Sequence, residues 1–258
     1  MEEECAWHIL LRCKKETILA KEETTLMNIL SGLEELEGIV GHNFANKSLL
    51  KSALSHSSFV NEVKTSKVEC YERLEFLGDA VLELSVSEFL FSKFPDKPEG
   101  YMTKLRASLV CEPTLAYIAR SELDLSKYIL LGKGEENTGG RNRDSIVSDV
   151  FEAIIGALYL DAGFDTAKKF VAKYVLENME QKIEFTDSKT NLQEYAQDKG
   201  LSVRYELVDE EGPAHDKIYY VEVYVGDKLS GKGAGKTKKN AEQHAAYEAL
   251  KSLKVSRL

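Results

Sequence analysis

The sequence predicts an all-α domain followed by a small α+β domain with the element order helix, strand, strand, strand, helix (α-β-β-β-α). From about residue 30 to residue 183, apolar residues recur at the three- and four-residue spacing of helices. After residue 188, apolar and polar residues alternate in short runs, as in half-buried strands. Residues 185–188 are polar and aperiodic, so we expect a linker between a domain at 28–184 and a domain at 189–258.

In the first domain, a helix is predicted to start at Asn46 or Lys47 and to run through Leu54. A long helix follows and ends before Pro95, because proline cannot continue a helix. A glycine-rich segment at 132–143 is predicted to be a loop. The long helix and its successors are expected at residues 71–93, 99–110, 113–121, 144–161 and 166–182.

In the second domain, the alternation of Tyr219, Val221, Val223 and Val225 is the clearest strand signal. The last predicted helix is amphipathic and rich in alanine. The helices of this domain are expected at 189–199 and 237–253, and its strands at 203–209, 217–225 and 228–232.

The composition is typical of a globular protein: of 258 residues, 43% are hydrophobic and 30% are charged. No run reaches the roughly 18 apolar residues of a membrane helix, so no membrane partner is expected. The four cysteines are scattered without a CxxC pair, which predicts reduced thiols in a cytoplasmic protein. Residues 1–27 form an N-terminal extension with three early acids, unlike a signal peptide, and translation from Met27 is an open alternative.

Acidic residues interrupt the apolar pattern of the predicted helix at 71–93. Glu72, Glu75 and Asp79 are spaced i, i+3, i+7 and share one face, while the rest of the helix is apolar nearly all round. We therefore expect this helix to be buried, with poorly solvated and mutually repulsive carboxylates. Burying such charges unpaired would cost several kcal/mol each.

A second apolar helix, at 144–161, repeats this anomaly with Asp149 and Glu152 at i, i+3. Gly78 and Gly156 would allow the two helices to approach closely, and Arg73 is the only base between Lys67 and Lys93. Bound divalent cations are the simplest way to compensate the negative charge of these carboxylates. Oxygen ligands suit Mg²⁺ or Mn²⁺. Such a site would support metal-assisted phosphoryl chemistry. The alternative is that these acids are surface salt-bridge partners.

Two long runs distinguish the first domain: ERLEFLGDAVL at 72–82 and SDVFEAIIGALYLD at 148–161. Through these runs the domain resembles the ribonuclease III family over residues 31–183. Shorter matches are LSHSS at 54–58, EG at 99–100 ahead of LRASLV at 105–110, and the glycine pair at 139–140.

The resemblance implies a homodimeric, metal-dependent nuclease. It implies that Mg²⁺, with Mn²⁺ as a substitute, is held by Glu75, Asp79, Asp149 and Glu152, of which Asp79 and Glu152 act in catalysis. Glu72 and Glu99 match further acids of the catalytic valley with lesser roles, and Phe76 matches a dimer contact. His56 could be read as a general base, but the family assigns none. Glu83 continues the acidic stripe and has no family role.

Three runs in the second domain carry a further resemblance: KTNLQEY at 189–195, GPAH at 212–215 and GKGAGKTKKNAE at 231–242. With these runs the domain resembles a double-stranded-RNA-binding domain, although the whole chain is acidic, with a net charge of −9. Residues 189–258 hold 12 Lys and Arg against 11 Asp and Glu. Thr237 is a predicted N-cap, and helix N-termini flanked by lysines bind phosphates. The resemblance implies readout of duplex shape and 2′-hydroxyls. The implied RNA-binding residues are Thr190, Gln193, Glu194, His215, Lys236, Lys238 and Lys239.

Together these observations predict an endoribonuclease that hydrolyses phosphodiesters of double-stranded RNA with Mg²⁺. The resemblance implies products with 5′-phosphate and 3′-hydroxyl ends, and roles in ribosomal RNA processing and turnover of structured RNA. One alternative is a non-catalytic RNA-binding regulator, which would have lost a metal ligand; all four acids are present. Another is a small-nucleotide phosphohydrolase, which the second domain disfavours.

Overall fold

The computed structural model describes residues 31–63, 69–212 and 217–253, and these divide between Ala45 and Asn46 into two units. In the described part of the first unit, residues 31–40 are helical. This helix ends at Gly41, whose φ of +78° is unfavourable for other residues. The carboxylate of Glu37 then accepts the N–H of Phe44 at 2.8 Å. The predicted extension at 1–27, with Met27, lies outside the described residues.

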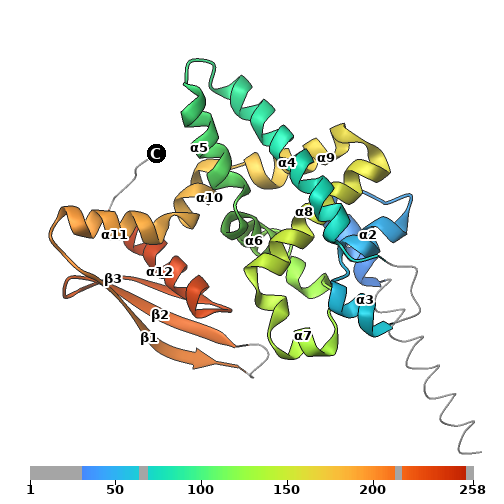
Figure 1. Ribbon diagram of the computed structural model, residues 1–258. Helices are drawn as coiled ribbons and strands as arrows, with labels where there is room; N and C mark the ends of the chain where they lie inside the picture. The colour runs from blue at the N-terminus through green and yellow to red at the C-terminus, as the bar shows by residue number, and fades with distance from the viewer. Residues whose placement is uncertain (1–30, 64–68, 213–216, 254–258) are drawn as a thin grey trace, which may run out of the picture. The chain divides into compact units, whose positions relative to one another are not determined.

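The second unit begins with a helical part, as predicted (Figure 1). The bounds of α4 and α5 lie within a residue of those predicted from the apolar pattern. The helical elements are α2 (Lys47–Ala53), α3 (Ser57–Val63), α4 (Glu72–Lys93), α5 (Glu99–Val110), α6 (Glu112–Ser121), η1 (Leu125–Tyr128), α7 (Lys133–Asn137), η2 (Gly140–Asn142), α8 (Asp144–Ala162), α9 (Phe164–Val171), η3 (Ala172–Leu176) and α10 (Met179–Thr186).

Helices α4 and α8 pack directly against each other at the centre of this helical part. Gly78 and Gly156 lie at the crossing, as the sequence suggested. A Cβ on Gly78 would overlap the carbonyl of Glu152, and a Cβ on Gly156 would overlap the carbonyl of Leu74. The two backbones therefore touch, which brings the acidic residues of both helices to the same place.

The single helix predicted at 166–182 is wrong, because the chain breaks there into α9, η3 and α10. Glu177 is extended and Asn178 has a left-handed φ of +53°. The buried Lys182 satisfies carbonyls left free by this break, donating to those of Tyr174 and Glu177 at 2.7 and 2.6 Å. A lysine that turns inward in this way is not visible in the apolar pattern.

The predicted loop at 132–143 contains two short helical segments, α7 and η2. Gly139, with a φ of +79°, makes the turn between them. Two ion pairs tie the turn together: Arg141 pairs with Glu136, and Arg143 pairs with Glu135. These local pairs explain why a glycine-rich segment is ordered into helical turns.

The segment 185–188, expected as a linker, is almost entirely helical. It comprises the end of α10, then Asp187, and then the first residue of α11 (Ser188–Asp198). Phe185 and Ser188 are buried. Gln243 donates to the carbonyls of Phe185 and Thr186, so this short polar segment has tertiary partners that its composition did not reveal.

The remaining elements form the predicted helix, three strands and helix. The strands β1 (Val203–Glu211), β2 (Ile218–Val225) and β3 (Lys228–Gly235) pair antiparallel in the order β1-β2-β3. Helix α12 (Lys238–Ser252) covers one face of the sheet and packs against α11 (Figure 1). Val221, Val223 and Val225 point into this core, confirming the alternation read from the sequence.

Strand β3 continues to Gly235, three residues beyond its predicted end at 232. Gly231, Gly233 and Gly235 alternate along it, and a Cβ at any of them would collide with the backbone of α12. Glycine usually weakens a strand, which is why the strand predicted from the sequence ended too early, at residue 232. Here it lets the alanine-rich face of α12 lie directly on the sheet.

Two further features concern the cysteines and the apolar helices. Cys70 and Cys111 are free thiols, and the other two cysteines lie outside the described residues. Among the described helices, none combines the length and the apolar character that crossing a membrane requires.

Candidate functional site

Helices α4 and α8 bring three of the predicted metal ligands together. Glu75 on α4 and Asp149 and Glu152 on α8 each offer a carboxylate oxygen, and these oxygens lie within 4.8 Å of one another. All three side chains are half-buried. The cluster forms because i, i+3 spacing on α8 aligns its two acids toward the α4 face that carries Glu75.

The structure does not bring the other predicted acids into this cluster, and they are more exposed. Glu72 and Asp79 flank Glu75 on α4, whereas Glu99 lines a pocket with Glu88 and Phe91 near the other end of that helix. Asp79 is exposed on α4, one turn beyond Glu75, and is not among the three clustered carboxylates. Glu72 is exposed at the start of α4, and Glu99 is exposed at the start of α5, where it accepts a hydrogen bond from Thr103. The expectation that every acid of α4 is buried is therefore wrong for this chain, since α4 packs along one side only.

Burial and mutual repulsion disfavour the ionised forms of these acids. Burial, and then the charges of Asp79, Asp149 and Glu75, raise the pKa of Glu152 to about 8. Burial and the neighbouring carboxylates also raise the pKa of Glu75. Burial, and then the charge of Glu83, raise the pKa of Asp79. Without a cation, Glu152 is therefore mostly protonated at neutral pH.

No lysine or arginine compensates this charge among the residues that the structure describes, although the charge of His56 acts to lower the pKa of Asp149. Neither lysine nor arginine forms an ion pair there with Glu75, Asp79, Asp149 or Glu152. Arg73 instead turns outward and pairs with Glu69 at 3.0 Å. Glu83, the acid without a family role, faces Arg106 at 4.0 Å. Clustered, half-buried carboxylate oxygens without a lysine or arginine partner fit a hard divalent cation.

Sequence analysis missed one polar neighbour of this cluster. The hydroxyl of Tyr71 lies 3.4 Å from Oδ2 of Asp149, and the Tyr71 side chain is only 5% exposed. Burial raises the pKa of Asp149, and the hydrogen bond from Tyr71 opposes this shift. The sequence signal was weak, because a lone tyrosine ahead of an apolar helix is most simply read as a core residue.

A second candidate surface surrounds the start of α12. Thr237 caps this helix as predicted, its side chain accepting the N–H of Asn240 at 3.1 Å. Lys236, Lys238 and Lys239 are exposed around the cap. The positive end of the helix and the three ammonium groups together suit phosphate oxygens.

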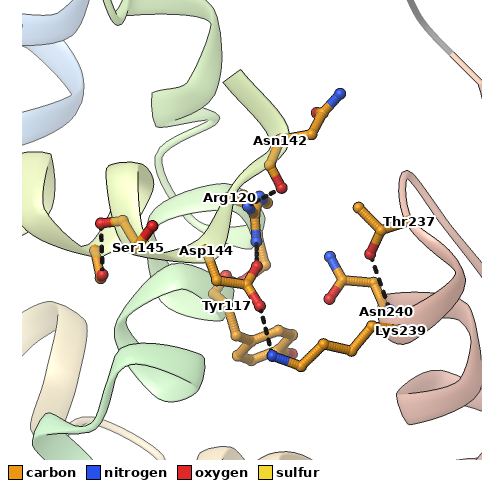
Figure 2. A network of polar contacts seen from close by, with 10 residues as sticks. Tyr117, Arg120, Asn142, Asp144, Ser145, Thr237, Lys239 and Asn240 are labelled. Atoms are coloured by element: carbon orange, nitrogen blue, oxygen red, sulfur yellow. Dashed lines mark hydrogen bonds and ion pairs between the residues drawn. The ribbon is translucent and has the colours of Figure 1, made fainter. Parts of the chain in front are cut away.

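Lys239 has an acidic partner in the helical part of the chain. The ammonium of Lys239 lies 3.0 Å from Oδ2 of Asp144, the first residue of α8, while Arg120 donates to Oδ1 at 2.6 Å (Figure 2). Arg120 also donates to the carbonyl of Asn142 at 2.9 Å. Although burial acts in the opposite direction, the hydrogen bonds from Arg120 and Lys239 lower the pKa of Asp144. A phosphate at Lys239 would therefore compete with this carboxylate.

The remaining predicted RNA contacts come from α11. Thr190, Gln193 and Glu194 are exposed on this helix. Lys189 pairs with Glu242 of α12 and so ties the two helices together. His215 lies outside the described residues.

Phe76, the predicted dimer contact, is strongly exposed on α4. Its exposed fraction is 79%, and Leu84 and Phe91 on the same helix are exposed by 57% and 72%. Large exposed apolar side chains grouped on one element are typical of a protein interaction surface.

Comparison with known proteins shows the family of each part. Residues 46–179 match the model of the family described as ribonuclease-III-like, and residues 188–253 match the double-stranded RNA binding motif. The first match covers the α4–α8 acidic cluster, and the second covers α11, the sheet and α12.

Related proteins match nearly the whole chain. A protein named Ribonuclease 3 from Listeria innocua is 49% identical over 223 residues, which is 85% of this chain and 97% of the relative. A Ribonuclease 3 from Staphylococcus aureus is 51% identical over 219 residues, covering 83% and 89%.

A solved structure supports the same assignment. The nuclease domain of ribonuclease III from Campylobacter jejuni, described as flexible in a region involved in dimer formation, is 48% identical. It matches with a TM-score of 0.52 and covers 57% of this chain and 97% of the solved one. Together with the acidic cluster and the capped, lysine-flanked helix, these matches show that the chain belongs to the ribonuclease III family and is an endoribonuclease specific for double-stranded RNA.

Proposed function

We propose that this enzyme cuts RNA duplexes with Mg²⁺ held by Glu75, Asp79, Asp149 and Glu152, leaving 5′-phosphate and 3′-hydroxyl ends. The observation that supports this most is the cluster of three carboxylate oxygens within 4.8 Å, without a lysine or arginine ion pair among the described residues. Mn²⁺ has the same preference for oxygen ligands and is expected to substitute.

The carboxylates have distinct tasks in this proposal. When bound, the cation supplies Lewis-acid assistance to the attack of water on phosphorus and to departure of the 3′ oxygen. Glu152 would lose its carboxyl proton as the site fills, because the charge of a nearby cation would offset the burial and the carboxylate repulsion that raise its pKa. Asp79 and Glu152 act in catalysis, while Glu72 and Glu99 contribute less.

The RNA-binding surface delivers the duplex to this site. Lys236, Lys238 and Lys239 contact phosphates at the start of α12, and Thr190, Gln193, Glu194 and His215 contact the minor grooves. Shape and 2′-hydroxyl contacts select RNA over DNA with little sequence preference. Support comes from the observed cap at Thr237 and from the exposure of the described residues.

We further propose a homodimer formed through the catalytic domain, with Phe76 at the contact. The exposed Phe76, Leu84 and Phe91 of α4 support this arrangement.

We also propose that the enzyme acts in the cytoplasm, in keeping with free thiols at Cys70 and Cys111. Its tasks there would be ribosomal RNA processing and turnover of structured RNA.

A cleavage assay tests the proposed chemistry. The purified full chain is incubated with a long RNA duplex in Mg²⁺, in Mn²⁺ and in EDTA. We expect short duplex products with either metal and none in EDTA. Kinase labelling of the 5′ ends should require prior phosphatase treatment, and poly(A) polymerase should extend the 3′ ends directly. Cleavage in EDTA, or the opposite end chemistry, would contradict the proposal; the Glu152→Ala variant, purified in parallel, controls for contaminating nucleases.

A further inference from the structure

The start of α4 places a buried tyrosine against the acidic cluster. Tyr71 immediately precedes the helix, and its backbone carbonyl accepts the N–H groups of Leu74 and Glu75 at 2.8 and 2.9 Å. Its hydroxyl reaches across to α8, where Oδ2 of Asp149 lies 3.4 Å away. The same residue therefore begins the helix of one proposed ligand and contacts another on the facing helix.

The LSHSS segment at 54–58 holds Tyr71 in place. The proposed mechanism gives this segment no other role. The backbone N–H of Tyr71 donates to the carbonyl of Ser55 at 3.0 Å, and Ser55 is fully buried. The rings of His56 and Tyr71 have centroids 5.8 Å apart. The segment is fixed in turn by its pairing with Leu130, since the N–H of His56 donates to the carbonyl of Leu130 at 3.0 Å.

The orientation of His56 is also fixed. Its Nδ1 accepts the backbone N–H of Ser58 at 3.1 Å and lies 2.8 Å from the Ser58 hydroxyl. That hydroxyl oxygen in turn accepts the N–H of Gly132 at 2.9 Å. Both groups near Nδ1 belong to the protein framework, so this nitrogen holds the turn together.

We propose that Tyr71 is a positioning residue for the metal site: its hydroxyl donates to Asp149 and fixes the rotation of that carboxylate, while the turn at 54–58 holds the Tyr71 ring in place. This rests on the proposed function, since it requires Asp149 to be a metal ligand. Residues that hydrogen-bond to a metal ligand and so fix its orientation typically contribute about 10- to 100-fold to metal affinity or activity. The 3.4 Å separation is long for a hydrogen bond, so we expect the lower end of that range.

The test compares metal binding by the full-length wild type and by Tyr71→Phe, without RNA. Bound and free Mn²⁺ are distinguished by electron paramagnetic resonance during titration. We expect Tyr71→Phe to bind Mn²⁺ about tenfold more weakly than the wild type. The matched control is Tyr174→Phe, which removes a similarly buried hydroxyl that accepts a hydrogen bond from Lys173 on η3. It should bind Mn²⁺ like the wild type.

Two further readouts separate positioning from a structural role. Thermal unfolding in EDTA should show similar melting temperatures for both tyrosine variants. In cleavage assays, Tyr71→Phe should need more Mg²⁺ for half-maximal rate and should recover at saturating Mg²⁺, with an unchanged KM for RNA. Equal Mn²⁺ affinity of Tyr71→Phe and the wild type would overturn the inference. Failure of the wild type itself to bind Mn²⁺ would instead overturn the proposed metal site, and the inference with it.

Discussion

At the residue scale, the chemistry depends on where each carboxylate lies relative to its neighbours. Glu152 is the most strongly perturbed of the acids, because it is half-buried beside three other carboxylates. Glu83 lies on the same helix as Glu75 and Asp79, but it faces Arg106 at 4.0 Å. An acid with a basic partner is a suitable control for acids without one.

We predict that Glu152→Ala and Asp79→Ala each abolish cleavage while duplex RNA binding survives, because these residues hold metal and not RNA. Loss of a ligand should lower the cleavage rate by orders of magnitude. Single-turnover cleavage and a binding titration in Ca²⁺ measure the two effects separately. Glu83→Ala is the control and should cleave normally. Full activity of both variants at saturating Mg²⁺ would refute the assignment.

The raised pKa of Glu152 predicts how stability depends on pH. Its pKa is about 8 in the folded chain against 4.5 as the ordinary value, so between these pH values only the folded chain keeps the proton. Stability of the metal-free protein should therefore fall as the pH rises through this window. Melting temperatures in EDTA, measured at several pH values across it, report the fall, which should be smaller in Glu152→Gln. An identical fall in both proteins would contradict the prediction.

At the element scale, the site depends on the contact between α4 and α8. The two helices meet at glycines, so their backbones lie closer than any side chain would allow. This contact determines the distance between Glu75 and the acids of α8. The same principle recurs between β3 and α12, where alternating glycines meet a face rich in alanine.

We predict that Gly78→Ala destabilises the fold strongly, because the new methyl group would overlap the carbonyl of Glu152. Overpacking of this kind typically costs about 1–3 kcal/mol, and a backbone collision should reach the upper end of that range. Gly100→Ala is the matched control, since it also lies within a helix but has open space around its Cβ. It should be neutral or slightly stabilising. Urea unfolding compares them, and equal stability of the two variants would show that the helices can separate at little cost.

At the scale of the whole molecule, RNA binding and catalysis belong to different groups of elements. The acids lie on α4 and α8, whereas the lysines surround the start of α12. Substitutions in one group should therefore affect one function and leave the other intact.

We predict that replacing Lys236, Lys238 and Lys239 with Ala weakens duplex RNA binding uniformly across sequences. Each lost phosphate contact should reduce the salt slope by about 0.9 if the B-DNA coefficient applies to duplex RNA. The cleavage rate at saturating RNA should change little. The control replaces Lys199, Lys228 and Lys251, exposed lysines elsewhere in the same domain. Unchanged affinity and salt slope in the first variant would place the RNA-binding surface elsewhere.

We also predict that the full chain is a dimer at micromolar concentration and that Phe76→Asp makes it a monomer. A charge at this 79% exposed position leaves the isolated fold intact but would be buried without a partner in the dimer. Light scattering should give twice 28.9 kDa for the wild type and 28.9 kDa for the variant. Leu207→Asp, at an exposed apolar position on β1, is the control and should stay dimeric. A monomeric wild type would refute the proposed dimer.

The sequence by itself determined the elements with a long apolar pattern: α4 and α8, which are apolar nearly all round, and β2 and α12, which have one apolar face. It also determined the pairing of acids on two apolar helices and the N-cap at Thr237. These features are local, because a hydrophobic period and a cap depend on residues within a few positions of one another.

Only the tertiary structure decided which acids meet and which residues support them. It grouped Glu75 with Asp149 and Glu152, left Asp79 at the rim, and placed the Tyr71 hydroxyl beside Asp149. It also broke the helix predicted at 166–182, where the inward-turned Lys182 satisfies the free carbonyls. Each of these outcomes joins residues distant in the chain or turns a polar group inward, and spacing along one helix carries no information about the atoms that face it.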